Sequence, residues 1–264
     1  MSDRHLVGLD IDGTILHEDG FMSPAVKRAA LAAAERGHEV MLATGRSSSS
    51  TIPVLEQLGL TPEYLVCSNG AVTLQRDPDA PDGYRRERIE TFDPSQVLTT
   101  ISGALTDARY AVEDAEGYFR YTAAFPEAAV GQASEEVPFE GLLEVAATRI
   151  VVISPNQGME EFLGVVDRMG LSRVSYAVGW TAWLDIAPDG VNKATAMEWV
   201  RGRLGVPHEL TVAVGDGRND IDMLEWAARG VAMGQAPSEV IAAANETTRE
   251  VRDDGCARVL DSLP

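Results

Sequence analysis

The stretch LDIDGT, residues 9–14, ends the apolar run Leu6–Ile11 near the start of this 264-residue chain. Asp10 and Asp12 are two positions apart, so on an extended chain their carboxylates lie on the same side, about 6–7 Å apart along it. Gly13 allows a sharp turn and lets backbone amides approach an anion closely. The stretch therefore predicts a strand that ends in two carboxylates, at the strand end where open α/β sheets bind ligands. A strand-ending Asx turn with no ligand is the alternative interpretation.

Short apolar runs alternate with helical stretches around this motif, and the same alternation returns in the last third of the chain. The expected strands are Leu6–Ile11, Glu39–Ala43, Tyr64–Cys67, Val72–Leu74, Leu210–Val214 and Val231–Met233. The expected helices are residues 23–37, Ser47–Leu58, Lys193–Leu204, Asp220–Ala228 and Pro237–Ala244. Continuous apolar strands joined by helices indicate a parallel sheet covered on both faces. We therefore expect an α/β fold with a Rossmann-like parallel-sheet core.

The middle of the chain has a different character, which begins at the Pro/Asp/Gly-rich segment DPDAPDG, residues 77–83. The expected strands there are Tyr84–Ile89, Tyr110–Val112, Tyr118–Tyr121, Ala147–Ile153, Val174–Val178 and Trp183–Ile186, with helices near Ser95–Asp107 and Gly158–Met169. This mixture predicts a smaller α+β domain. We therefore place the core domain at residues 1–82 and 188–264, and an inserted α+β domain at residues 83–187.

The chain is strongly acidic, with 41 Asp and Glu residues against 22 Lys and Arg and a formal net charge of −19. No Lys/Arg-rich stripe is present, so the composition argues against binding to nucleic acid or to an anionic membrane. The two cysteines, Cys67 and Cys256, give neither a disulfide framework nor a metal-binding spacing. No signal-peptide core and no run of 18 apolar residues is present. We expect a cytoplasmic protein that is a monomer or a homodimer.

The stretch ATGRS, residues 43–47, stands at the end of the next expected strand and at the start of a helix. The Thr44 hydroxyl, the flexible Gly45 and the amides of a helix N-terminus together suit a phosphate group. Arg46 is either a phosphate contact or a surface cation, and Ser47 is either a ligand or a plain N-cap. This stretch therefore predicts a phosphate-binding loop only in combination with other motifs.

The stretch GVNK, residues 190–193, opens a helix in the last third of the chain. Lys193 is one of only two lysines among the 22 basic residues, so a lysine here indicates a compact charge for a phosphoryl oxygen or a carboxylate. A surface lysine is the alternative, although the helix dipole disfavours a cation in the first turn.

The stretch GDGRND, residues 215–220, follows the apolar strand Leu210–Val214. Asp216 ends that strand and can supply a further carboxylate to a hard cation. Asn219 and Asp220 either support the site or cap the following helix. Mg²⁺ prefers a few carboxylates, water and substrate phosphate in octahedral oxygen geometry, so we predict Mg²⁺ as the cofactor.

Together the four stretches place carboxylates, a hydroxyl and a lysine at one edge of one sheet. Phosphoryl transfer needs this inventory, namely a nucleophile, an acid and base, charge neutralisation and positioning. The negative field of the whole chain repels phosphate, so a local cation must overcome it.

These four motifs, in this order, resemble those of the haloacid dehalogenase superfamily of phosphatases, and the inserted domain resembles the type IIB (C2B) cap of its Cof-like branch. The resemblance covers nearly the whole chain. It implies Asp10 as the nucleophile, Asp12 as the acid and base, and Mg²⁺ held by the Asp10 side chain, the Asp12 backbone carbonyl and Asp216. The implied phosphate-binding residues are Thr44, Gly45, Arg46, Lys193 and Asn219. Gln235 departs from the pattern, because the family commonly has Asn there.

The expected function is hydrolysis of a small phosphorylated metabolite through an aspartyl-phosphate. A phosphomutase, or a phosphatase committed to one sugar phosphate, is the alternative within enzymes, because the same fold serves both. A non-catalytic phospho-acceptor protein is the alternative from another class, since receiver domains also combine strand-end aspartates with a Thr or Ser and a Lys. Asp12 and the large inserted domain argue against that alternative.

The inserted domain offers two weak candidates for substrate contacts. The segment 179–183, GWTAW, resembles a hairpin tip with two indoles that either line the closed site or fill the inserted domain's own core. Arg149 on an expected strand could meet an anionic leaving group, but a surface position is the favoured interpretation.

Overall fold

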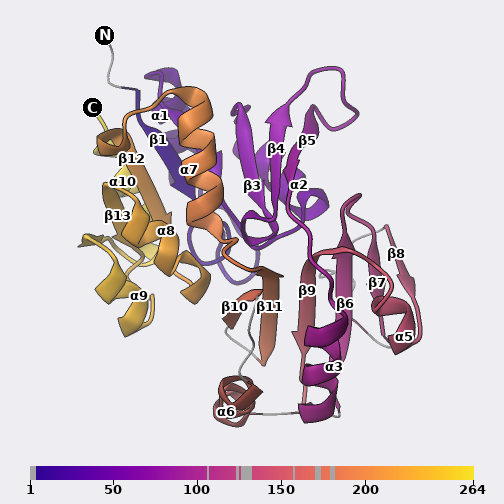
Figure 1. The fold of residues 1–264 in the computed structure, drawn as a ribbon. Coiled ribbons are helices and arrows are strands. Elements are labelled where there is room, and N and C mark those ends of the chain that lie inside the picture. Colours follow the sequence, from indigo (N-terminus) through magenta and orange to yellow (C-terminus); the bar gives the residue numbers. More distant parts are fainter. Residues whose placement is uncertain are drawn as a thin grey trace.

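The computed structural model describes residues 4–105, 107–122, 125, 133–156, 158–169, 174–178 and 182–264. A five-stranded parallel sheet forms the core, in the order β14-β13-β12-β1-β2 (Figure 1). Its strands are β1 (Leu6–Leu9), β2 (Glu39–Leu42), β12 (Thr211–Gly215), β13 (Arg229–Ala232) and β14 (Glu246–Thr247). The predicted α/β fold with a parallel sheet is therefore confirmed.

Helices cover both faces of this sheet because its strands alternate apolar side chains between two clusters. Val7 and Leu9 pack toward α1, α2 and α10, whereas Leu6 and Met41 pack toward α7, α8 and α9. The helices are α1 (Pro24–Glu35), α2 (Ser48–Leu58), α7 (Lys193–Leu204), α8 (Ile221–Trp226), α9 (Ser238–Ala243) and α10 (Gly255–Asp261). The short 3₁₀ turns are η1 (Ser68–Gly70), η2 (His208–Leu210), η3 (Arg218–Asp220) and η4 (Val251–Asp253).

Local signals fix the ends of the two helices that frame the core. The N-cap Ser23 accepts a hydrogen bond from the Val26 amide and Pro24 follows at the first helical position of α1. Asn192 and Thr195 form a reciprocal capping box at the start of α7, and Gly205 ends that helix with φ 64°. The start of α7 is therefore held in place by its own sequence.

A second, antiparallel sheet is built from β3 (Tyr64–Cys67), β4 (Val72–Arg76) and β5 (Tyr84–Ile89). A single parallel bridge between Ala43 and Val66 joins it to the edge of the core sheet. The sequence placed Tyr84–Ile89 in the inserted domain, but this strand pairs with β4 and so lies with the core. We therefore propose that the inserted domain begins after Ile89 rather than at residue 83.

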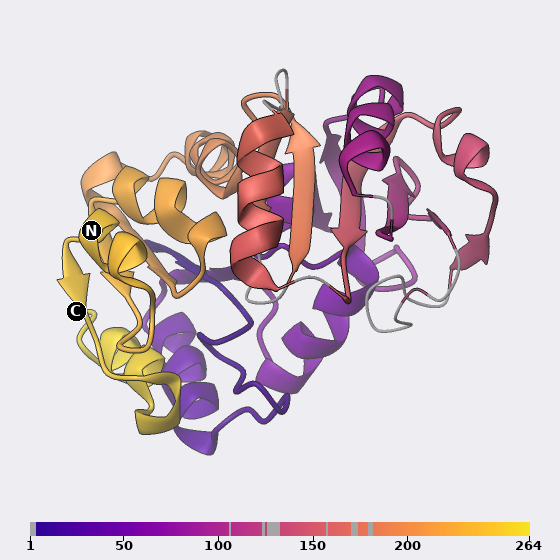
Figure 2. The same ribbon diagram turned by 90° about the horizontal axis from the view of Figure 1, so that it is seen from below.

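The inserted domain is a six-stranded sheet with helices on one side, in the order β10-β11-β9-β6-β7-β8. Its strands are β6 (Arg109–Asp114), β7 (Phe119–Tyr121), β8 (Ser134–Glu136), β9 (Ala147–Ile153), β10 (Val174–Val178) and β11 (Trp183–Pro188). Its helices are α3 (Ser95–Ala104), α5 (Phe139–Leu142) and α6 (Met159–Met169), and Figure 2 shows α3 and α6 beside the sheet. Apolar residues of both helices bury one face of β6, β9 and β11.

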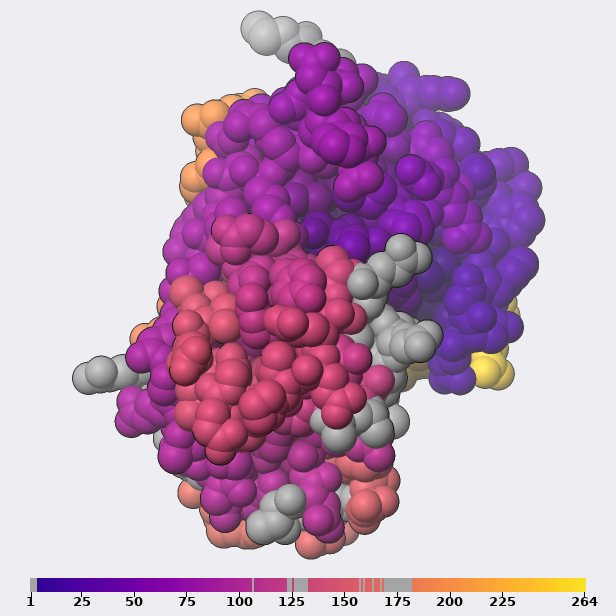
Figure 3. Space-filling model, turned by 90° about the vertical axis from the view of Figure 1, so that its right-hand side faces the viewer, coloured from indigo at the N-terminus to yellow at the C-terminus, as the bar shows by residue number. Residues whose placement is uncertain are grey.

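The inserted domain lies directly against the core domain, as the space-filling view shows (Figure 3). Strand β11 approaches η1, and β10 approaches η3, so the inserted sheet borders the loops that follow the core strands. We call it the cap from here on. Within the described residues, no helix is long and apolar enough to cross a membrane.

Candidate active site

The first predicted motif ends β1, as expected from the sequence. Asp10 follows the strand and its side chain is buried, and its backbone amide donates to the Val214 carbonyl of β12 at 3.0 Å. Gly13 has φ 79°, and a Cβ there would come within 2.1 Å of the Asp216 carboxylate. Only glycine can therefore pass this point, and that close approach brings the first and fourth motifs together.

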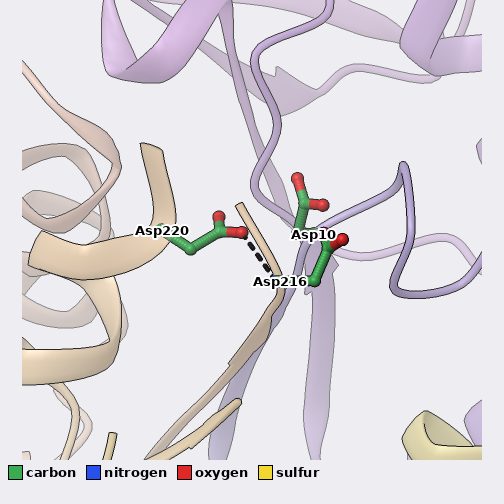
Figure 4. Close-up of side chains that lie close together, drawn as sticks. All are labelled: Asp10, Asp216 and Asp220. Carbon is green, nitrogen blue, oxygen red and sulfur yellow. Dashed lines mark hydrogen bonds between the residues drawn. The ribbon is translucent and has the colours of Figure 1, made fainter. Parts of the chain in front are cut away.

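Three carboxylates meet behind this turn. One oxygen from each of Asp10, Asp216 and Asp220 lies within 4.8 Å of the other two, and all three side chains are buried (Figure 4). Asp220 also accepts hydrogen bonds from the Asp216 and Gly217 amides, each at 2.9 Å. Asp220 is therefore part of the cluster, rather than the plain helix cap that the sequence left open.

Lys193 supplies the positive charge of the cluster. Its Nζ is fully buried and lies 2.7 Å from Asp10 Oδ1 and 2.6 Å from Asp220 Oδ1. Burial alone would lower the pKa of Lys193, but Asp10 and Asp220 together raise it above its ordinary value. The two carboxylates thus offset the unfavourable helix dipole, and the surface alternative for Lys193 is wrong.

The carboxylates exceed the cations in this cluster, and their pKa values reflect it. Burial, and next the charge of Asp220, raise the pKa of Asp10 well above its ordinary value. The same two causes raise the pKa of Asp216 to about 7. Buried carboxylate oxygens that repel one another are the donor set that a hard divalent cation binds, so the residues present fit Mg²⁺.

Asp12 occupies a different environment from Asp10. Its side chain is 61% exposed and accepts hydrogen bonds from Arg46 Nε at 2.8 Å and from Arg46 Nη2 at 2.5 Å. The Asp12 side chain therefore lies outside the buried cluster of Asp10, Asp216 and Asp220. Arg46 contacts this carboxylate, so it is neither an isolated surface cation nor part of the cluster.

The second motif lies beside Asn69 and Asn219. Thr44 is buried, its carbonyl accepts from the Asn69 amide at 3.0 Å, and its Oγ1 accepts from the Arg46 amide at 3.1 Å. A Cβ at Gly45 would lie 3.1 Å from Asn69 Oδ1, and that oxygen accepts from Asn219 Nδ2 at 3.0 Å. The structure thus brings Thr44, Gly45 and Asn219 to one place.

Asn69 and Gln235 are neighbours of the site to which the sequence assigned no contact. Asn69 follows β3 and has a φ of 52°, which is typical of a tight turn. Gln235 Nε2 donates to the Gly13 carbonyl at 2.6 Å and to Asp216 Oδ2 at 3.3 Å, and its Oε1 accepts from the Val251 amide at 3.0 Å. The longer side chain at 235 therefore still reaches the carboxylate cluster.

The two cap candidates have separate outcomes. Arg149 is buried and its Nη2 lies 2.6 Å from Asp185 Oδ1, so the favoured surface position is wrong. Trp183 is half-buried against an apolar cluster that includes Ala111 and Val151, whereas the rest of the segment, apart from Ala182, lies outside the described residues.

Known proteins are similar to this chain over most of its length. The model of the haloacid dehalogenase-like hydrolases matches residues 7–260. A Bacillus subtilis protein, 5-amino-6-(5-phospho-D-ribitylamino)uracil phosphatase, is 26% identical over 97% of this chain and 96% of its own length. The phosphoglycolate phosphatase of Natronomonas pharaonis is 28% identical over 97% of this chain and 96% of its own length.

Solved structures share the whole fold. A sugar phosphatase of haloacid dehalogenase subclass IIB superposes with a TM-score of 0.82 at 21% identity, over 97% of this chain and 98% of that one. A haloacid dehalogenase-like hydrolase from B. subtilis gives a TM-score of 0.83 at 22% identity, over 98% of this chain and all of that one (100%). The chain therefore belongs to the haloacid dehalogenase-like hydrolase family, and it is a phosphatase of that family.

Proposed function

We propose that this phosphatase hydrolyses small phosphomonoesters with Mg²⁺, through an aspartyl-phosphate formed on Asp10. The observation that carries the proposal is the buried Asp10 carboxylate, which lies 2.7 Å from Lys193 Nζ and within the cluster that also holds Asp216 and Asp220. A carboxylate attacks a phosphate ester only when nearby positive charge removes their mutual repulsion.

The first half of the reaction transfers the phosphoryl group to the protein. An oxygen of Asp10 forms a bond to phosphorus, the bond from phosphorus to the ester oxygen breaks, and Asp12 gives a proton to the departing alkoxide. The exposed Asp12 side chain, next to Arg46, is on the side from which an ester can enter. The two carboxylates of the first motif therefore serve separate roles because their surroundings differ.

The second half of the reaction hydrolyses the aspartyl-phosphate and restores the Asp10 carboxylate. Asp12 takes a proton from water, the water oxygen bonds to phosphorus, and the bond from phosphorus to the Asp10 oxygen breaks. Lys193, Thr44 and Asn219 would hold the phosphoryl oxygens during both halves. Asp10, Asp216 and the Asp12 carbonyl would hold Mg²⁺, which neutralises phosphoryl charge when it is bound.

The names of the relatives support small phosphomonoesters as substrates but do not identify one of them. One relative is named for a phosphorylated ribitylaminouracil and another for phosphoglycolate, so one leaving group carries a ribityl chain on a uracil ring and the other carries a carboxylate. A phosphomutase would pass the phosphoryl group to a second sugar hydroxyl, and a phospho-acceptor protein would retain it. Release of inorganic phosphate over many turnovers separates hydrolysis from both.

Replacement of Asp10 by Asn tests the nucleophile. The variant keeps the size of the side chain but removes the attacking oxygen's charge, so phosphate release from p-nitrophenyl phosphate with Mg²⁺ should fall about 10⁴-fold or more. Asp79→Asn is the matched control because Asp79 is exposed in the segment 77–83 and should leave the rate unchanged. Normal turnover by Asp10→Asn would refute the nucleophile assignment.

A further inference from the structure

The turn η1 has a left-handed backbone at the edge of the site. All three of its residues have positive φ, which is 48° at Ser68, 52° at Asn69 and 101° at Gly70. A Cβ at Gly70 would come within 2.2 Å of the Asn192 carbonyl, so the turn packs tightly against the start of α7. Left-handed backbone is unfavourable for residues other than glycine, so Ser68 and Asn69 keep this conformation only because the surrounding contacts fix it.

Hydrogen bonds connect η1 to the residues that would hold the phosphoryl group. The Ser68 amide donates to the Arg46 carbonyl at 2.8 Å. The Asn69 amide donates to the Thr44 carbonyl at 3.0 Å, and Asn69 Oδ1 accepts from Asn219 Nδ2 at 3.0 Å. A shift of η1 would therefore displace the phosphate-binding loop and release the side-chain amide of Asn219.

The cap reaches the side chain of Ser68. Ser68 Oγ donates to Glu113 Oε2 at 2.7 Å, and both residues are fully buried. Glu113 belongs to β6, a strand of the cap sheet (Figure 1). A hydrogen bond to a carboxylate is stronger than one between neutral groups, and removal of either buried partner leaves the other unsatisfied. The cap therefore supplies one of the contacts that fix the left-handed turn of the core.

Arg86 of β5 holds Glu113 in place relative to the core. Its Nη2 donates to Ser48 Oγ of α2 at 2.7 Å and lies 4.0 Å from Glu113 Oε1. Its Nη1 donates to the Ala115 carbonyl, in the turn between β6 and β7, at 3.1 Å. A Cβ at Gly117 would come within 2.1 Å of this guanidinium, so only glycine lets the turn pass so close. One guanidinium thus joins α2 to the turn that follows Glu113, and it compensates part of the charge of that buried carboxylate.

We propose that Glu113 is a positioning residue for phosphoryl transfer. By accepting from Ser68 Oγ it holds η1 in the left-handed conformation, and through η1 it holds the phosphate-binding loop in the geometry that transfers the phosphoryl group. This inference rests on the proposed function, because it assigns one more residue to the same reaction. Because Glu113 acts through Ser68 and not on the leaving group, its loss should lower the rate by the same factor for every ester.

The experiment measures kcat, KM and the inhibition constant of orthovanadate for Ser68→Ala and Glu113→Ala with saturating Mg²⁺. Orthovanadate carries no leaving group, so its affinity reports on the residues that would hold the phosphoryl oxygens. Each variant should lower kcat about tenfold or more and raise the inhibition constant by a similar factor, because small misplacements of groups that bind the transition state are costly. The loss should be the same for p-nitrophenyl phosphate and for glycerol 1-phosphate.

A double variant and a conservative variant test whether the hydrogen bond carries the effect. Ser68→Ala combined with Glu113→Ala should lose no more than the larger single loss, because both changes remove the same bond. Glu113→Gln keeps an oxygen that accepts from Ser68 Oγ and should retain most of the wild-type kcat. Ser68→Ala removes a single oxygen, so it decides the outcome if Glu113→Ala does not fold. Fully additive losses, or a Glu113→Gln variant as slow as Glu113→Ala, would overturn the inference.

Thr211→Val is the matched control. Thr211 is also buried, and its Oγ1 donates to the His208 carbonyl at 2.6 Å and accepts from the Ala228 amide at 2.9 Å. It begins β12, at the end of the sheet opposite to the site, so the variant should lower the melting temperature but leave kcat and the inhibition constant unchanged. Unchanged kcat in Ser68→Ala, or a loss confined to one ester, would overturn the inference while wild type still hydrolyses both esters. No hydrolysis by wild type would instead overturn the proposed function.

Discussion

The carboxylate cluster at the strand ends of the core and the buried Arg149–Asp185 ion pair of the cap differ in how their charges are balanced. In the core, Asp10, Asp216 and Asp220 share one cation, Lys193, and the pKa of Asp216 rises to about 7. In the cap, Arg149 is matched directly by Asp185. The carboxylates of the core cluster therefore outnumber their cation, whereas the Arg149–Asp185 pair of the cap balances its own charge.

The largest expected effect comes from removing Lys193, the cation of the carboxylate cluster in the core. Lys193→Met leaves the buried Asp10 and Asp220 without their cation, and breaking a buried ion pair costs about 3–5 kcal/mol of unfolding free energy. The rate of phosphate release should fall about 10³-fold, because a donor to the transferring group is lost. Urea unfolding and kcat measure the two effects.

Lys27→Met is the control for that variant. Lys27 is exposed on α1 and is the other lysine of the chain, so its loss should change the unfolding free energy by less than about 0.5 kcal/mol. If Lys193→Met behaved like Lys27→Met, the buried cluster would not need its lysine, and the contrast between core and cap would fail.

The next effect is a dependence of stability on pH, which arises because the carboxylates of the core cluster outnumber its one cation, Lys193. Burial and Asp220 raise the pKa of Asp216 in the folded chain to about 7, against about 3.9 for an unfolded aspartate. Between these values the folded state binds more protons than the unfolded state, so this group's contribution to stability falls as pH rises from 4 through 7 and levels off above. Mg²⁺ competes with those protons.

Melting temperatures test this linkage. In EDTA the protein should lose stability from pH 5 to pH 8, and Mg²⁺ should raise the melting temperature more at pH 8 than at pH 5. The variant Asp216→Asn should show a weaker pH slope and a smaller response to Mg²⁺. An equal Mg²⁺ response at both pH values, or full phosphatase activity in EDTA, would contradict the metal site.

The smallest of these effects belongs to the cap pair. Arg149→Met leaves the Asp185 carboxylate without its cation and should cost about 1–3 kcal/mol. The double variant Arg149→Met with Asp185→Leu should recover part of that loss, because a self-neutralised buried pair can be replaced by apolar side chains at little cost. Chemical denaturation of the single and double variants gives the coupling. A double variant less stable than the single one would show that the pair is not self-contained.

The elements that frame the core site could be predicted from the sequence because the patterns that indicate them are local. A strand end, a sharp turn at Gly13 and a helix start at Lys193 each depend on adjacent residues, so α7 was predicted with its observed bounds and β1 within two residues of its observed end. The contacts that were missed join distant segments. Asn69 meets Asn219 across 150 positions, and no pattern within either segment indicates the other.

The cap was predicted less completely for the same reason. A β-strand pattern specifies which residues alternate, but not which strand is the partner, so the pairing of Tyr84–Ile89 with β4 was not predicted. Arg149 was expected at the surface because arginine is seldom buried without a partner. Its partner Asp185 lies 36 positions away and becomes a neighbour only when β9 and β11 pair.

The most direct measurement is rapid-quench trapping of the protein with a ³²P-labelled phosphomonoester and Mg²⁺, followed by peptide mapping. The account predicts an acid-stable, hydroxylamine-sensitive label on the peptide that contains Asp10, formed and lost at rates consistent with kcat, and absent from Asp10→Asn. A label on another residue, or rapid hydrolysis by the Asp10→Asn variant, would contradict it.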